Sequence, residues 1–355
     1  MRSLPVSHPA HARRRRPATA IGPAAALMAV VLGCWSSPEG QVVVYCAQDA
    51  EFAEPVFADY ASQTGIEVRP KFDVESTKTV GLAEALLAER GRPRCDVFWN
   101  NEILHTLRLE KEGLLEAYVA GADARFPASA RSPDGTWRGF AARARVLLVN
   151  TQLLPEAERP KSIVDLANPK WRGRVAVAKP LFGTTATHAA CLFAAWGDVR
   201  AKTFFTDLKR NDVRILAGNK RVAEAVSAGQ IVFGLTDTDD ALGEIDKARP
   251  VAIVYPDQEA DGLGTLLIPN TLAVLRNAPH PEAARRLVEY LLSPGVERRL
   301  ADGPSGQIPL QSSVARPAKL GLPANLKTMH VDFRAAADRW PAASAALTDL
   351  FASAE

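Results

Sequence analysis

The sequence predicts an α/β fold of two lobes, each a mostly parallel sheet covered by helices, with a hinged cleft between them. Over residues 41–111, short β-branched runs alternate with segments of helical periodicity, as expected for parallel strands joined by helices. A second such series begins at Arg143, after a loop over 127–139 that is rich in proline, glycine and serine. We expect the chain to cross from one lobe to the other there.

Three βα units make up the first series. β-branched and aromatic runs, too short for helices, predict strands at 42–45, 66–72 and 96–99. Apolar residues at helical spacing, each series followed closely by a glycine, predict helices at 53–64, 79–90 and 102–111.

The second series has the same alternation. Short apolar runs predict strands at 143–149, 175–177, 213–216 and 231–235. Helical spacing predicts helices at 188–196, 201–209 and 221–228. An amphipathic helix over 281–292, a short helix over 294–300 and a mostly helical tail over 327–353 complete the chain.

These elements predict the lobe boundaries. We assign 41–142 together with about 264–305 to lobe 1, and about 143–263 together with 306–355 to lobe 2. Because ligands of open α/β sheets bind beyond the carboxyl ends of the strands, the loops after each strand are the candidates for a site.

The N-terminal segment has the pattern of an export leader. Four arginines at 13–16 precede an apolar stretch over 18–33, which is shorter than the ~20 residues that a transmembrane helix needs. The stretch ends in Leu32-Gly33-Cys34, which resembles a bacterial lipobox. We therefore expect a signal peptide over 1–33, a lipid-anchored tether over 34–40 and lipidation at Cys34, with membrane contact through the lipid alone. The alternative is a simple secretory leader with an incidental cysteine.

The charge distribution argues against a nucleic-acid partner. Five arginines and no acidic residue precede residue 34, and they exceed the formal net charge of +3. The rest of the chain is therefore near neutral and has no basic footprint. An odd number of later cysteines does not make a disulfide framework. Cys46 and Cys95 could pair, and Cys191 is expected in the core.

Four stretches, in order along about 41–315, carry a family resemblance. They are Val44-Tyr45 followed by Gln48, the strand 96–99, Pro-Lys-Trp-Arg-Gly at 169–173, and 279–284 leading into 290–293. Together they resemble the extracellular solute-binding proteins of ABC transporters, in the ferric-iron branch with the type II periplasmic-binding fold. The resemblance implies a non-enzymatic component that captures a ligand in the cleft. It would deliver this ligand to an ABC transporter permease in the cytoplasmic membrane. We expect a monomer, because cleft closure needs no partner.

The resemblance also implies where a metal would bind. The ferric branch holds Fe³⁺ through a histidine after the first strand, a glutamate after the third, and a tyrosine pair after a strand of lobe 2. The first two positions fall at Asp49 and at Asn101, with Glu102 beside it. The tyrosine pair falls at about Thr238-Asp239, so none of the four ligands is retained.

The loop Thr236-Asp237-Thr238-Asp239-Asp240 follows a strand of lobe 2 and gathers three carboxylates. Hard cations such as Fe³⁺ bind such oxygens, and a substrate ammonium group or sugar hydroxyls would also suit them. The alternative is an acidic cap at a helix start. The metal ligands expected from both lobes are Asp49, Glu102, Asp237 and Asp239. Trp99 could stack on an organic ligand or belong to the core.

Gly183, Thr184 and Thr185 follow a strand and open a helix. The first amides of a helix lack intrahelical partners and carry partial positive charge, so this position suits phosphate, carbonate or a carboxylate. The alternative is an ordinary threonine cap. The resemblance implies that Asn219 meets the same anion; the alternative is a loop asparagine that supports a turn. Ser76, Thr77 and Lys78 offer a second anion cradle or a solvated cap.

Arg143 and Arg145 alternate on the strand that crosses between the lobes, so their side chains face the same side. Either guanidinium could hold an anion in a bidentate manner. We expect Arg145 to contact the ligand and the other arginine to form an inter-lobe salt bridge.

The ligand expected first is ferric iron or another hard metal with a phosphate or carbonate helper anion, without any resident cofactor. The alternative is a small organic anion such as a phosphonate or a sugar phosphate, with its acid group on Thr184 and Thr185. A hydrolase using one of these threonines with His188 and an aspartate is the alternative from another class. No nucleophile elbow, P-loop or metalloprotease helix supports it.

Overall fold

The computed structural model describes residues 40–73 and 79–351. The expected leader over 1–33, the lipidation site Cys34 and the segment Ser76, Thr77 and Lys78 lie outside these residues. The predicted α/β class is confirmed: parallel strands alternate with helices over most of the described chain.

The first half-sheet is built from the segments that were expected to open the chain. Its strands, in spatial order, are β2 (Glu67–Phe72), β1 (Gln41–Cys46), β3 (Val97–Asn100) and β9 (Leu267–Val274). The first three are parallel, and β9 is antiparallel to β3. The helices associated with it are α1 (Ala50–Thr64), α2 (Val80–Ala88), α3 (Leu104–Lys111), α7 (Pro281–Leu291) and α8 (Pro294–Asp302).

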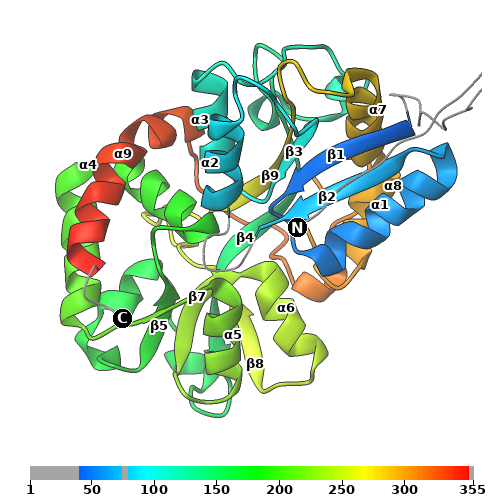
Figure 1. Cartoon of the computed structure of the whole chain (residues 1–355). Coiled ribbons are helices and arrows are strands. Elements are labelled where there is room, and N and C mark those ends of the chain that lie inside the picture. Colours follow the sequence, from blue (N-terminus) through cyan, green and yellow to red (C-terminus); the bar gives the residue numbers. More distant parts are fainter. Residues whose placement is uncertain (1–39, 74–78, 352–355) are drawn as a thin grey trace, which may run out of the picture. The chain divides into compact units, whose positions relative to one another are not determined.

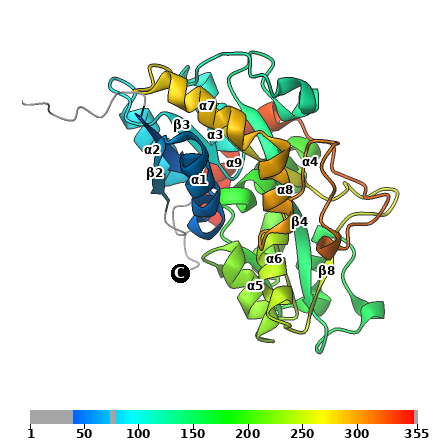
Figure 2. The same cartoon turned by 90° about the vertical axis from the view of Figure 1, so that its right-hand side faces the viewer.

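The second half-sheet continues from β4. Its strands are β4 (Arg138–Asn150), β7 (Phe233–Asp237), β5 (Val175–Ala178), β6 (Arg214–Leu216) and, on the other side of β4, β8 (Val251–Val254). Its helices are α4 (Gly183–Arg210), α5 (Asn219–Ser227), α6 (Thr238–Asp246) and α9 (Phe333–Phe351). Figure 1 shows α9 lying along α4, and Figure 2 shows α5 and α6 side by side.

The long strand β4 joins the two half-sheets. All of its 13 residues are buried, as expected for a strand with neighbours on both edges and both faces. Its first part pairs with β9, and its second part pairs with β7 and β8. β4 begins five residues before the predicted start at 143, because residues 138–140 pair with β9 although the sequence there has loop character.

Each half-sheet has its own apolar core. Trp99 packs edge-on against Phe57 and tilted against Phe140 beside the first half-sheet. Trp171 packs at 90° against Phe233 beside the second. Separate cores fit a chain of two lobes; the lobe boundaries at 142/143, about 263/264 and 305/306 stay a prediction.

Two predicted helices, at 188–196 and 201–209, are joined in α4. Gly197 interrupts the helix with φ 76° and ψ 166°, a conformation that glycine adopts at little cost. The sequence therefore placed both helical segments correctly, and the kink at Gly197 lies between them.

The cysteines do not form a disulfide in the described residues. Cys46, Cys95 and Cys191 are all buried, and none of them is in a disulfide. β1 and β3 are parallel in a register that sets Cys46 opposite Trp99, four residues beyond Cys95. At ~3.3 Å per residue the two thiols are therefore about 13 Å apart along the strands, too far for a disulfide. Among the described residues, no helix is long and apolar enough to cross a bilayer.

The crossing strand contains a strained bulge that a buried carboxylate holds. The β4–β9 register shifts between Phe140 and Arg143, and Ala141 adopts φ 42°. A positive φ is unfavourable for alanine. Glu297 accepts hydrogen bonds from the amides of Ala141 at 2.8 Å, Leu310 at 3.0 Å and Gln311 at 3.0 Å. One carboxylate thus ties β4 to α8 and to the segment that follows it.

We expect Glu297→Ala to lower the free energy of unfolding by about 3 kcal/mol, because two buried amides and one partly buried amide lose their acceptor. Urea unfolding of purified protein measures this difference. Glu282→Ala is the matched control, since its side chain is 70% exposed, and it should change stability by less than about 0.5 kcal/mol. Equal effects of the two substitutions would contradict the role given to Glu297.

Candidate functional site

The carboxyl ends of several strands meet at one small polar cavity, as predicted for this fold class. Its volume is about 40 Å³, enough for an ion with one or two waters. Its polar and charged lining residues are Asp49, Asn101, Arg143, Lys179, Thr184, Thr185, Asn219, Asp237, Asp239 and Asp240. Gly183, Gly218, Phe182, Ala178 and Ala217 complete the lining.

Two residues line the cavity from the first half-sheet. Asp49 occupies the N-cap position of α1 after β1, yet its side chain makes no cap hydrogen bond to the helix. Asn101 directly follows β3 and is 3% exposed. The Oδ1 atom of Asn101 is buried and has no hydrogen-bond partner. Because an unpaired buried carbonyl oxygen is costly, this atom is suited to a ligand that enters the cavity.

Helix α4 begins at the cavity with Gly183, Thr184 and Thr185. The N-cap residue is Phe182, so neither threonine acts as the helix cap. Gly183 has φ 55°, which glycine tolerates, and both threonines are at least 95% buried. Their hydroxyls are therefore available for a polar network beneath the cavity instead of capping the helix.

Arg145 and Asp237 form the centre of that network. The two residues lie directly opposite each other in the antiparallel β4–β7 pair, and their side chains are 0% and 4% exposed. Arg145 Nη1 donates to Asp237 Oδ1 at 2.7 Å, to Asn219 Oδ1 at 3.0 Å and to Thr184 Oγ1 at 3.2 Å. Arg145 Nη2 donates to Thr185 Oγ1 at 3.2 Å.

The second oxygen of Asp237 is also occupied. Asp237 Oδ2 accepts from Thr184 Oγ1 at 2.5 Å and from Asn219 Nδ2 at 2.9 Å. Asp237 stands at the N-cap position of α6 but makes no side-chain cap bond. The four residues predicted around an anion site, Thr184, Thr185, Asn219 and Arg145, are thus brought together, and they surround a carboxylate of the protein itself.

Arg143 connects the two half-sheets at the same cavity. Its Nη2 donates to Gln48 Oε1 at 2.6 Å, and its Nε lies 3.5 Å from Asp239 Oδ2. The contact of Arg143 with the first half is thus a hydrogen bond to Gln48, and its ion pair is with Asp239 of the second half, so this ion pair is not the expected inter-lobe salt bridge.

Electrostatics favour the charged form of Arg143. Burial acts to lower the pKa of its guanidinium, but the carboxylates of Asp239, Asp237, Asp49 and Asp240 outweigh this and raise the pKa. The guanidinium remains protonated and offsets part of the negative charge.

Asp237, Asp239 and Asp240 form an acidic cluster. One oxygen of each lies within 4.8 Å of the others. The cavity lining carries four carboxylates against Arg143 and Lys179, with Arg145 beneath. The site therefore combines hard oxygen donors with a nearly balanced charge, which limits the mutual repulsion of the carboxylates.

Arg145, which was expected to contact the ligand, and four further predicted site residues lie outside the cavity lining. Trp99 is fully buried, and its Nε1 donates to Asn270 Oδ1 at 3.4 Å. It therefore belongs to the apolar core, which was the alternative to stacking on a ligand. Glu102 is also fully buried and accepts from the amides of Leu104 and His105 and from Thr187 Oγ1, so its carboxylate joins the first turn of α3 to α4.

Thr236 and Thr238 are fully buried as well. Thr236 Oγ1 donates to Asn219 O at 3.0 Å, and Thr238 Oγ1 accepts from the amide of Ala144 at 3.1 Å. Both hydroxyls are used by the fold. Because successive side chains of a strand point to opposite faces, Asp237, which follows Thr236 in β7, faces the cavity instead.

Lys179 and Asp240 line the cavity and were not among the predicted contacts. Lys179 follows β5, so the rule that ligands bind beyond the strand ends could have identified it. Each of the chain's five tyrosines lies in the described part, and none lines this cavity.

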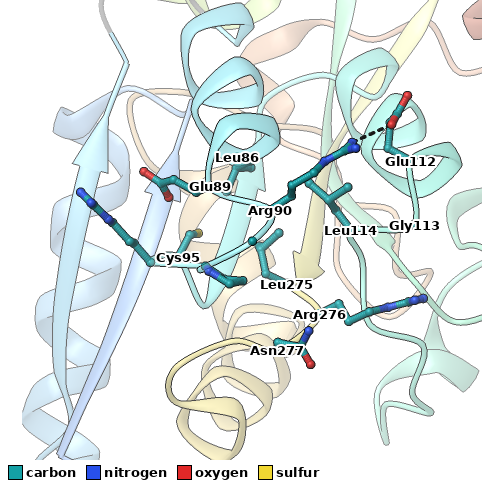
Figure 3. Close-up of a pocket in the computed structure, with 13 residues that line it drawn as sticks. Leu86, Glu89, Arg90, Cys95, Glu112, Gly113, Leu114, Leu275, Arg276 and Asn277 are labelled. Carbon is teal, nitrogen blue, oxygen red and sulfur yellow. Dashed lines mark hydrogen bonds and ion pairs between the residues drawn. The ribbon is translucent and has the colours of Figure 1, made fainter.

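A larger cavity of about 360 Å³ lies at the opposite end of β3. It is lined by Cys95, Leu275 and the side chains drawn in Figure 3. Arg90 turns toward Glu112, which it meets at 2.7 Å, while Arg276 extends away from Leu275. Because these charged groups do not converge, the smaller polar cavity is the better candidate site.

His188, on α4 close to the network, is 4% exposed. Burial, and then the charge of Arg145, lower the pKa of His188 well below its ordinary value. The imidazole is therefore neutral in the folded protein near neutral pH, whereas the unfolded chain takes up a proton below about pH 6.5.

Stability should consequently fall as pH is lowered from about 6.5 to about 5, by about 1 kcal/mol per pH unit from this residue. The sign follows because the unfolded state binds the extra proton. His188→Met should flatten the slope in urea unfolding, whereas His330→Gln, at an exposed histidine, should leave it unchanged. A His188→Met protein with the wild-type slope would contradict this account.

Comparison with known proteins places these features in a family. Iron uptake protein A1 of Synechocystis is 27% identical over 297 residues, which span 80% of this chain and 78% of that protein. The ferric binding protein from Campylobacter jejuni superposes with a TM-score of 0.79 at 20% identity, over 87% of this chain and 99% of that one. The periplasmic binding protein AfuA from Actinobacillus pleuropneumoniae, with fructose-6-phosphate bound, superposes with a TM-score of 0.77 at 19% identity, over 89% and 99%.

The structural likenesses show a shared two-lobed fold, the type II periplasmic-binding fold predicted from the sequence. The profile of the bacterial extracellular solute-binding protein family matches residues 42–302, most of the described chain. The chain therefore belongs to the bacterial extracellular solute-binding protein family.

Proposed function

We propose that this protein is the extracytoplasmic binding component of an ABC importer and that its ligand is a hard metal cation, ferric iron first. Asp239 and Asp240 from the second half-sheet, with Asp49 and Asn101 from the first, would supply the oxygens. Ligands drawn from both halves would favour the closed form, which the permease recognises. The names of the relatives that take up iron support the choice of metal.

The observation that carries the proposal is the Oδ1 atom of Asn101. It is buried, lacks a hydrogen-bond partner and belongs to a residue that lines a cavity with four carboxylates. A cation bound by the aspartates would satisfy it. The small volume of about 40 Å³ also suits an ion better than an organic molecule in this conformation.

A second ligand class is favoured by a different observation. Two buried arginines, Arg143 in the cavity lining and Arg145 beneath it, lie close to hydroxyl and amide donors. A small organic anion such as a phosphonate or a sugar phosphate would use these donors, and the fructose-6-phosphate of the AfuA structure is of this class. It would have to compete with Asp237 for Thr184 and Asn219, which makes it the weaker candidate.

We also place the protein outside the cytoplasmic membrane, anchored through lipid on Cys34, as a monomer that serves a permease and has no catalytic activity. A phosphate or carbonate helper anion, expected from the resemblance at Thr184 and Thr185, would meet hydroxyls that already bond Asp237 and Arg145.

Thermal unfolding of the purified protein tests the ligand class. Ferric iron supplied with citrate or phosphate should raise the melting temperature. A ligand at ~100 times its dissociation constant adds about 2.7 kcal/mol of stability. Asp239→Ala should abolish the shift, and Glu282→Ala, at an exposed carboxylate, should retain it. A shift with a phosphonate or sugar phosphate alone, lost on Thr184→Val, would favour the organic anion instead.

The ferric complex should lack a visible charge-transfer band, because no tyrosine lines the cavity to offer a phenolate to the metal. An absorption spectrum of the iron-loaded protein, compared with the metal-free protein, measures this. An intense visible band would mean that a tyrosine reaches the iron, contrary to the proposed ligand set.

A further inference from the structure

We infer that the carboxylate of Asp237 is an internal substitute for a bound anion, so that a metal cation binds in the cavity without phosphate or carbonate. This inference rests on the proposed function, because it concerns how the same site takes a metal.

The surroundings of Asp237 have the composition of an anion site. A guanidinium, a hydroxyl and a side-chain amide donate to its two oxygens, from Arg145, Thr184 and Asn219. Thr184 and Asn219 stand in the first turns of α4 and α5, where the partial positive charge of a helix start favours an anion. Free phosphate or carbonate would need these same donors.

The side-chain donors that meet Asp237 already bond within the protein, while Arg145 Nε is buried without a hydrogen-bond partner. Asn219 Nδ2 is divided between Asp237 Oδ2 and Thr184 Oγ1, both at 2.9 Å. Thr184 directs its hydroxyl proton to Asp237, and Thr185 directs its own to Asn219 Oδ1 at 3.1 Å. A free anion placed here would therefore face the negative charge of Asp237 across a short distance, which is strongly unfavourable at a buried site.

The same contacts separate the roles of the three aspartates in the acidic cluster. Both carboxylate oxygens of Asp237 are hydrogen-bonded within the network, and its ion pair with Arg145 is 2.7 Å long. Asp239 makes a longer ion pair of 3.5 Å with Arg143. We assign the metal to Asp239 and Asp240, which stand in the first turn of α6 and line the cavity. Asp237 fixes the charge and geometry behind them.

The test is ferric perchlorate titration of the full purified protein in buffer freed of phosphate and bicarbonate, followed by tryptophan fluorescence, with each anion then restored. We expect the dissociation constant to change by less than about twofold on adding either anion. Native mass spectrometry of the loaded protein should show one metal and no phosphate or carbonate.

Asp237→Ala should create the missing anion site, because Arg145, Thr184 and Asn219 lose their internal partner. Metal binding by this variant should weaken about tenfold or more without anions and should recover when phosphate or formate is added. Asp239→Ala is the matched control. It should also lose metal binding, but neither phosphate nor formate should restore that binding.

The outcomes separate the inference from the proposed function. Suppose that wild-type protein binds iron only when phosphate or bicarbonate is present, and that native mass spectrometry shows the iron and that anion bound together. The inference is then overturned while the proposed function stands. If no iron binds in either buffer, the proposed function fails and the inference with it. The wild-type arm decides the question even if Asp237→Ala does not fold.

Discussion

The cross-strand pair of Arg145 and Asp237 is the interaction on which the site depends. Both side chains are almost fully buried, and burying either charge alone would cost several kcal/mol. Because the two charges pair, β4 and β7 can each place a charged side chain in the protein interior. The pair also orients Thr184, Thr185 and Asn219 at the starts of two helices. Removing either Arg145 or Asp237 would therefore disturb the whole polar network beneath the cavity.

The crossing strand β4 sets the geometry around this pair. It joins the two half-sheets, and within three residues it places Arg143 toward Gln48 and Asp239, and Arg145 toward Asp237. The bulge at Ala141, held by Glu297, lies just before these arginines. A change of angle between the halves would therefore act first on the Arg143 contacts, which connects ligand capture to closure.

Local sequence patterns predicted much of this fold but less of the site. Strand and helix periodicity located most elements, and the strand-end rule brought Asp49, Asn101 and the acidic loop to one cavity. The register of β4 on β7, which sets Arg145 opposite Asp237, depends on pairing between segments 92 residues apart and is not encoded locally. For the same reason the sequence left open whether Trp99 was core, because Phe57 and Phe140 surround it from distant segments.

Anomalous diffraction from crystals of the iron-loaded protein tests the central claim most directly. The account predicts one iron peak in the polar cavity, bonded to oxygens of Asp239, Asp240, Asp49 and Asn101, with Asp237 still paired to Arg145 and no added anion beside Thr184. An organic anion held by Arg145 with no metal, or iron bound by a tyrosine elsewhere in the chain, would contradict it.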